Sequence, residues 1–477
     1  MVLAMLLAAI EGTIVATAMP SIAARLGGFA LYGWVFSSYL LMQAVMTPIF
    51  GKLADLYGRK PVLIAGIGLF LVGSVLCGLA TSMVMLVVFR FVQGIGAGAV
   101  MPITATLVGD LYSIEERGRV QGYMASVWGV SSIIGPLAGG LIVEHADWHW
   151  IFWLNVPFGL IAIALIGRYL HEHMAHRGRR IDYAGAALLL TGLIGLMLAL
   201  TQGSVWGAGP AVGLAGAAIA ILVFFVGQQG RAEDPIMHLE LWRNPVIRIG
   251  NLTILAAGLA MIGLISYLPT FMQGVLGTSA LVAGFTLSAM SIGWPIASVV
   301  AGRLFTRLGV RTLVRTGSGC AVTGALLIAL FADYGPVLAG PGSFLLGVGL
   351  GLLNTTIIVA IQSSVAWPQR GVATATNLLM RNLGNAVGAA VLGGVLNLSL
   401  AAYLKRQGLT GRVSLDSVRS LVEEGASGPP LAPALADLLR AGLSGSLHLV
   451  FWGIFLCTAA MLLIGWRIPE PGANKPA

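Results

Sequence analysis

Long apolar stretches separated by short polar segments run along the whole chain. A helix needs about 20 apolar residues to cross the hydrocarbon core of a bilayer. By that measure the sequence predicts fourteen membrane-spanning helices, at residues 2–23, 33–53, 61–81, 84–110, 119–143, 150–170, 183–201, 209–229, 248–274, 280–302, 312–332, 337–364, 372–398 and 446–466. The predicted fold class is therefore an all-α integral membrane protein.

The composition excludes a water-soluble protein. Charged residues make up 9% of the 477 residues and hydrophobic residues 57%, whereas soluble proteins carry about 25% charged residues. With the N-terminus inside, 19 of the 27 Lys and Arg residues fall on the cytoplasmic side. The positive-inside rule then places both termini in the cytoplasm. The net charge of +9 faces acidic lipid headgroups, and we expect no nucleic-acid partner.

A short charged loop bounded by glycines occurs twice. Residues 51–60 read GKLADLYGRK, and a fainter copy, GRLFTRLGVR, occupies residues 302–311. This repeat predicts two related six-helix bundles, residues 1–170 and 248–477, with a substrate site between them near mid-membrane. A two-helix insert with cytoplasmic flanks would occupy residues 171–247. The external loop 399–445 is expected to form a short amphipathic cap.

Several motifs, in this order along the chain, resemble those of a known family. Residues 51–60 resemble the cytoplasmic signature loop of the major facilitator superfamily. Further similarities to its fourteen-helix drug:proton antiporter branch cover residues 11–20, 90–98, 129–140, 148–157, 234–235 and 241–244. The resemblance implies a transporter that exports a small molecule in exchange for protons.

Glu11 is the carboxylate that lies far from both ends of its predicted span, roughly 15 Å into the bilayer at the rise of an α-helix. An ionisable side chain at that depth is costly and is a functional-site hypothesis by default. The family motif normally begins with Asp at this position. Arg90 and Arg381 are the cations within spans, and our hypothesis is that Glu11 pairs with one of them in one conformational state. We expect these three residues to couple transport to protons, a role that the resemblance links to Arg90.

The charged loop and the end of the fourth span are expected to form a conformational gate. Asp55 can accept hydrogen bonds from exposed amides at a helix N-terminus, and Arg59 can bridge to Asp110. These contacts would form only when the two halves close on the inside. The second copy has Thr306 in place of Asp55, which predicts a one-sided latch. The predicted gate residues are Gly51, Asp55, Gly58, Arg59, Lys60 and Asp110.

The fifth span carries the segment that resembles the antiporter motif, namely Gly135, Pro136, Gly139 and Gly140. Proline removes a backbone donor and small residues permit close helix packing. We interpret this segment as a conformational device without chemistry of its own.

Polar or aromatic residues inside the remaining spans are candidates for the substrate cavity: Tyr39, Gln43, Trp128, Asn251, Tyr267, Trp294, Asn354 and Asn377. Aromatic faces suit flat lipophilic cations. The histidines at 171, 173 and 176 share a basic loop, so a metal site is not expected. No cofactor and no nucleophile–base pair is indicated, so the chain is not expected to be an enzyme.

The sequence thus predicts proton-coupled efflux of lipophilic, neutral or monocationic molecules by alternating access. The protein is expected to be a monomer in the bacterial cytoplasmic membrane, with protons, lipids and a small-molecule substrate as partners. The alternatives are a dedicated exporter of one metabolite, lipid or siderophore, a proton-driven importer, and a non-transporting membrane sensor on the same fold.

Overall fold

A computed structural model describes residues 1–26, 31–170, 182–206, 208–232, 235, 239–278, 280–408 and 433–470. All regular structure among these residues is helical. The first part of the chain forms α1 (Val2–Leu26), α2 (Tyr32–Tyr57), α3 (Arg59–Gly78), α4 (Met83–Leu111), α5 (Ile114–His145), α6 (His149–Trp153) and α7 (Asn155–Tyr169).

The middle and last parts follow the same pattern. They form α8 (Tyr183–Trp206), α9 (Ala208–Gln229), α10 (Pro245–Gly274), α11 (Ala280–Phe331), α12 (Pro336–Ser363), α13 (Arg370–Arg406) and α15 (Pro433–Gly465). Short 3-10 turns lie at Leu239–Arg243, Ala332–Tyr334 and Trp367–Gln369. Every predicted span overlaps these helices. Ten helices of the described chain are long and apolar enough to cross a membrane.

The spans predicted at 280–302 and 312–332 both fall in α11, which consists of two helices that meet at a kink at Gly309. Part of the predicted external loop 399–445 is helical, because α13 continues to Arg406 and α15 begins at Pro433. The apolar positions near 435–439 belong to this longer last helix, and residues 409–432 lie outside the described chain.

The two copies of the charged loop share a backbone geometry. Gly58 and Gly309 both have a positive φ, 101° and 73°, a conformation that glycine adopts without steric cost. In each copy a basic residue two positions later binds a carbonyl at the end of the last helix of its own half. Lys60 Nζ donates to Gly167 O at 2.7 Å, and Arg311 Nε donates to Ile468 O at 3.4 Å. The sequence repeat is therefore also a structural repeat.

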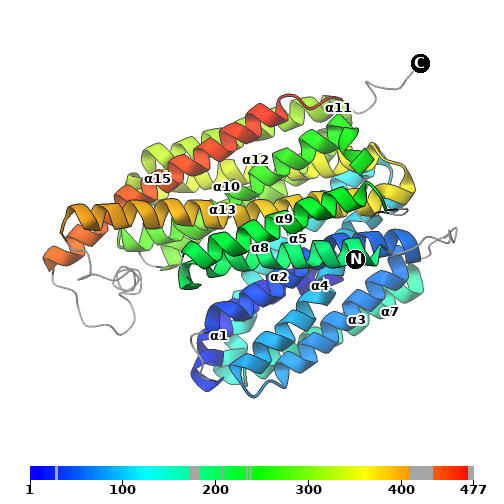
Figure 1. Ribbon diagram of the computed structural model, residues 1–477, viewed down its shortest axis with the longest axis horizontal. Helices are drawn as coiled ribbons and strands as arrows, with labels where there is room; N and C mark the ends of the chain where they lie inside the picture. The colour runs from blue at the N-terminus through cyan, green and yellow to red at the C-terminus, as the bar shows by residue number, and fades with distance from the viewer. Residues whose placement is uncertain are drawn as a thin grey trace.

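The hydrophobic cores follow the two halves of the molecule. A large cluster is built almost entirely from α10 to α15, and smaller clusters lie within α1 to α7. In Figure 1 the helices run side by side, with α1 to α7 on one side and α10 to α15 on the other. The boundaries of the two bundles, residues 1–170 and 248–477, remain predictions.

The inserted hairpin α8–α9 covers the line where the two halves meet. A separate core cluster joins Leu189 and Leu193 of α8 to Leu41 and Val45 of α2 and to Leu379 of α13. Figure 1 shows this hairpin between the two sets of helices, alongside α13.

Candidate functional site

Glu11 lies on α1 with its side chain fully buried, at 0% exposure. Both of its carboxylate oxygens accept a hydrogen bond. Arg90 Nη1 on α4 donates to Oε1 at 2.5 Å, and Asn155 Nδ2 at the start of α7 donates to Oε2 at 2.6 Å. The deep carboxylate therefore ties α1 to two other helices of the first half.

Arg90 is held by more than this ion pair. Its Nη1 also donates to Gln93 Oε1 at 2.7 Å, and its Nε donates to the backbone carbonyl of Val35 at 3.0 Å. The guanidinium carbon lies 4.2 Å from the centre of the Tyr39 ring. These contacts fix the cation between α2 and α4, where a cation–π contact adds to the ion pair.

Ser74 on α3 completes a closed ring of hydrogen bonds. Its Oγ accepts from Gln93 Nε2 at 2.8 Å and from Asn155 Nδ2 at 2.9 Å. The resulting ring, which we call the Glu11 ring, consists of five buried residues: Glu11, Arg90, Gln93, Ser74 and Asn155.

Our sequence reasoning did not select Ser74, Gln93 or Asn155 as site residues. The signal was present, because each is a polar residue inside a predicted apolar span. Buried polar groups need hydrogen-bond partners, so polar residues on neighbouring spans could have been considered together with Glu11.

The segment resembling the antiporter motif packs on α1 at Thr13 and Ile14. A Cβ atom added at Gly135 would overlap the side chain of Thr13, two residues from Glu11. Thr13 Oγ1 also donates to the carbonyl of Ser131 at 3.1 Å. By contrast, a Cβ at Gly140 would meet open space. Gly139 is buried, and α5 remains helical through Pro136.

Asp55 reaches across to the other half of the molecule. Its carboxylate accepts from the backbone amides of Gly371 and Val372, at 3.2 and 2.8 Å, at the N-terminus of α13. It also pairs with Arg59 at 2.9 Å. Because a helix N-terminus carries partial positive charge, the carboxylate binds α13 by charge as well as by hydrogen bonds.

Asp110, at the end of α4, lies between two arginines from opposite halves. Arg59 Nε lies 2.8 Å from Asp110 Oδ2, and Arg370 Nη1 lies 3.1 Å from Oδ1. Arg370 also donates to Gly109 O at 2.9 Å. The sequence did not point to Arg370, because a basic residue in a predicted cytoplasmic loop is unremarkable.

We call the side of the molecule that carries the two charged loops, residues 51–60 and 302–311, the basic end. The two halves also touch there through α5 and α11. Gly118 of α5 and Gly302 of α11 lie so close that a Cβ on either would overlap the other's backbone. Gln362 Nε2 donates across the halves to Ala105 O at 2.9 Å. The structure is therefore closed at the basic end.

The other predicted gate residues have different neighbours. A Cβ at Gly51 would overlap Ala375 of α13, so this glycine allows α2 to approach the other half. Gly58 supplies the turn, and Lys60 contacts α7 within its own half.

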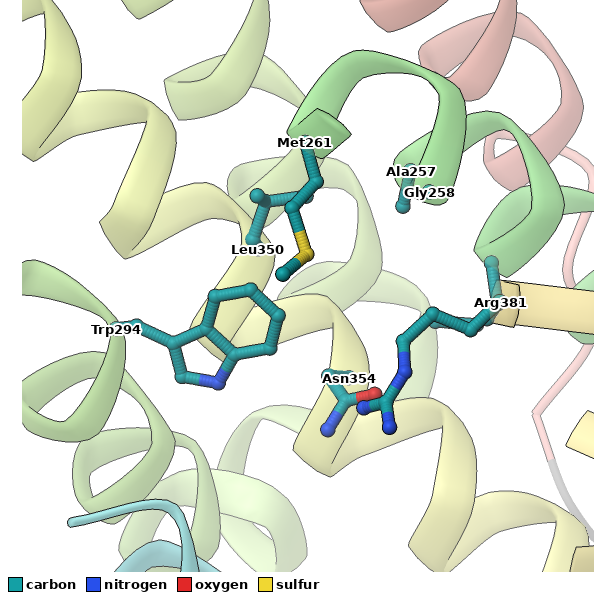
Figure 2. Close-up of a pocket in the computed structure, with 8 residues that line it drawn as sticks. Ala257, Gly258, Met261, Trp294, Leu350, Asn354 and Arg381 are labelled. Carbon is teal, nitrogen blue, oxygen red and sulfur yellow. The ribbon is translucent and has the colours of Figure 1, made fainter. Parts of the chain in front are cut away.

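The predicted cavity residues do not form one site. Asn377 Nδ2 donates to Asn251 Oδ1 at 2.9 Å, both buried. Trp294, Asn354 and Arg381 line one cavity in the second half (Figure 2). Tyr39 belongs with Arg90, Trp128 is 48% exposed, and Gln43 and Tyr267 are partly buried.

Arg381 does not contact Glu11 in this conformation. Arg381 lies on α13. Glu11 instead forms its ion pair with Arg90, the other arginine expected as its partner. The histidines at 171, 173 and 176 fall outside the described residues. Within the described chain, no cluster of three or more His, Cys, Asp or Glu residues could hold a metal ion.

Comparisons with known proteins agree with this architecture. A profile of the Major Facilitator Superfamily matches residues 1–389. The chain is 32% identical to the multidrug transporter protein MdtP of Bacillus subtilis, over 100% of this chain and 93% of that protein. It is 36% identical to multidrug resistance protein 3 of the same organism, over 83% of this chain and 78% of that protein.

Solved structures share the fold at low sequence identity. The human organic anion transporter MFSD10 superposes with a TM-score of 0.64 at 17% identity, covering 95% of this chain and 97% of that one. The proton:xylose symporter XylE gives a TM-score of 0.64 at 14% identity, covering 98% and 94%. The predicted all-α fold is thereby confirmed. The chain belongs to the major facilitator superfamily and is a multi-pass membrane transporter with multidrug efflux relatives.

Proposed function

We propose that the protein exports lipophilic small molecules in exchange for protons, as a member of the fourteen-helix antiporter branch. It would act in the bacterial cytoplasmic membrane with its basic end in the cytoplasm. The observation that carries the proposal is the Glu11 ring, in which the deep carboxylate is buried, ion-paired and held between α1, α4 and α7. The names of the Bacillus relatives, a multidrug transporter and a multidrug resistance protein, support export of small molecules.

The ring suggests how a proton could be sensed. Glu11 pairs with Arg90, and both of its carboxylate oxygens accept hydrogen bonds. Protonation would remove the charge that holds Arg90, and disrupting a buried ion pair costs about 3–5 kcal/mol. A single proton is therefore enough to change the relative stability of two arrangements of α1 and α4.

Helix α5 could carry this change to the basic end. It packs on α1 at Gly135, beside Thr13, and on α11 at Gly118, against Gly302. Neither contact can change unless a helix moves. Packed interfaces switch between discrete arrangements rather than deforming smoothly. A shift of α1 would thus bias the contact that closes the two halves.

The available energy is sufficient for useful export. A potential of 100 mV is worth about 2.3 kcal/mol per elementary charge, and about 1.4 kcal/mol corresponds to a factor of ten in an equilibrium. One net charge per cycle would support accumulation of roughly fiftyfold.

Everted membrane vesicles test the proposal, with the neutral lipophilic dye Nile red as the probe. Acidifying the vesicle interior should drive dye uptake by the wild type. We expect uptake to fall at least about tenfold in Glu11→Gln, which cannot ionise, and to persist at a lower rate in Glu11→Asp. Glu144→Gln, at an exposed carboxylate, is the matched control.

Proton-driven uptake by Glu11→Gln at the wild-type rate would contradict the proposal and favour a sensor or a different coupling residue. Uptake that requires an alkaline interior would identify an importer.

A further inference from the structure

The cavity beside Arg381 contains a cation without a carboxylate. Arg381 extends from α13 toward Asn354 of α12, with Trp294 and Met261 on the facing wall (Figure 2). Among the residues that the structure describes, none forms a hydrogen bond or an ion pair with the Arg381 side chain. The N–H groups of its guanidinium can therefore donate hydrogen bonds to a ligand, and the surrounding side chains are mainly apolar.

The helices around this cavity offer no counter-ion. The stretches that form it, α10, α11, α12 and α13, contain no Asp or Glu at any position. Glu11, the deep carboxylate of the first half, is occupied by Arg90 and Asn155. Of Glu11, Arg90 and Arg381, the last is therefore the one without a charged partner among the described residues. Its side chain is partly buried, and withdrawing a charge from water is costly unless the charge is paired.

Further unsatisfied polar atoms lie on the same helices. Asn377 and Asn385 stand one turn before and one turn after Arg381 on α13. Their Oδ1 atoms are buried and without a hydrogen-bond partner, as is Nδ2 of Asn251. Most buried polar groups in proteins are satisfied, so this part of α13 has unused hydrogen-bonding capacity beside an unpaired cation.

The cavity is small, and most of its lining is apolar. Its volume is about 10 Å³, room for about one water molecule, which suits one oxygen of an anionic group. Apart from Arg381 and Asn354, its lining consists of Ile254, Ala257, Gly258, Met261, Trp294 and Leu350. An indole face suits a flat hydrophobic body.

We propose that Arg381 and Asn354 bind the anionic head of flat, amphipathic monoanionic substrates, whose apolar body contacts Trp294 and Met261 when helix movement widens this cavity. This inference rests on the proposed efflux function and names its substrate class. It departs from the expectation of neutral or monocationic substrates, which rested on Glu11 as the single deep carboxylate. It also assigns Arg381 to substrate binding rather than to proton coupling.

Equilibrium binding of a matched probe series tests the inference. The purified protein in phosphatidylcholine nanodiscs is titrated with pyrenebutanoate, pyrenebutanol and pyrenebutylamine, which share one fluorophore and differ in charge. For the wild type we expect pyrenebutanoate to bind at least about tenfold more tightly than the other two, since charge-assisted hydrogen bonds are about twice as strong as neutral ones.

Substitutions locate the preference. In Arg381→Gln the ratio should fall below about twofold, whereas Arg381→Lys should retain part of it. Arg248→Gln is the matched control, because Arg248 is an exposed arginine on α10. Equal binding of the three probes by the wild type, or an unchanged ratio in Arg381→Gln, would overturn the inference.

A lipid headgroup is the other source of an anion, and a second arm separates the two. Phosphatidylglycerol added to the nanodiscs should leave pyrenebutanoate affinity within about twofold. A tenfold loss would assign Arg381 to an anionic lipid and overturn substrate binding. Because these measurements need no proton gradient, their failure would leave the vesicle experiment with Nile red to decide proton coupling.

Discussion

At the scale of single residues, the deep carboxylate of Glu11 is paired with Arg90, which lies in the same half of the molecule. Glu11 has two short hydrogen bonds, and Arg90 has acceptors on α1, α2 and α4. Continuum arguments make a buried ion pair a weak source of stability, but removing one partner is strongly destabilising. The pair is therefore suited to a switch, because its energy depends on whether a proton is present.

A double-mutant cycle measures this dependence. Arg90→Gln leaves a buried carboxylate with Asn155 as its remaining partner and should destabilise the protein by about 3–5 kcal/mol. The double variant Arg90→Gln with Glu11→Gln should recover at least about 2 kcal/mol of that loss, since neither charge remains. Thermal unfolding in detergent gives the comparison, and additive effects of the two substitutions would contradict the pairing.

The sequence predicted this pair only in part. Depth alone selected Glu11, Arg90 and Arg381, but depth does not say which helices are neighbours. The choice of Arg90 depends on α1 and α4 lying in the same bundle, and the bonds of Asn155 depend on the break between α6 and α7. Such contacts join residues 79 and 144 positions apart, which local patterns do not encode.

At the scale of secondary-structure elements, helix ends close the basic end. The N-terminus of α13 meets the Asp55 carboxylate, and the end of α4 meets Arg59 and Arg370 through Asp110. In the second repeat the amides of Val310 and Arg311 bind Glu470, which belongs to the same half. The Asp55 contact thus joins the halves, whereas its counterpart does not.

Removing the Asp55 charge should open the basic end. A carboxylate at a partly buried helix N-terminus contributes up to about 2 kcal/mol, so Asp55→Asn should shift the open-to-closed ratio about tenfold. Spin labels at Tyr57→Cys and Arg307→Cys, both exposed, report the distance between the halves once Cys77, Cys320 and Cys457 are replaced by Ala.

The matched control for this shift is Thr306→Asn, at the equivalent and exposed position of the second repeat. It should leave the distance distribution unchanged. An unchanged distribution in Asp55→Asn, or equal opening in both variants, would argue against a one-sided latch.

The elements were largely predictable, and the reason is the bilayer. Apolar length predicted every helical segment, because a span must satisfy its backbone internally. The differences concern helix ends: α13 and α15 both extend beyond their predicted apolar spans. Hydropathy cannot place these ends, because helices continue into water wherever their polar residues allow it.

At the scale of the whole molecule, the two halves are closed at the basic end while the Glu11 ring is intact. Helix α5 touches both regions, because it contacts α1 at Thr13 and α11 at Gly302. Under the proposed function, the ion pair of Glu11 belongs to the closed state, so a ligand that changes the population of that state must also change proton binding.

Proton release on substrate binding tests this central claim most directly. Purified protein in weakly buffered detergent, with a pH indicator dye, is mixed with Nile red. We predict release of about one proton per wild-type protein molecule, by linkage between the two ligands, and none from Glu11→Gln. An equal proton signal in Glu11→Gln, or saturable dye binding by the wild type without proton release, would contradict this claim.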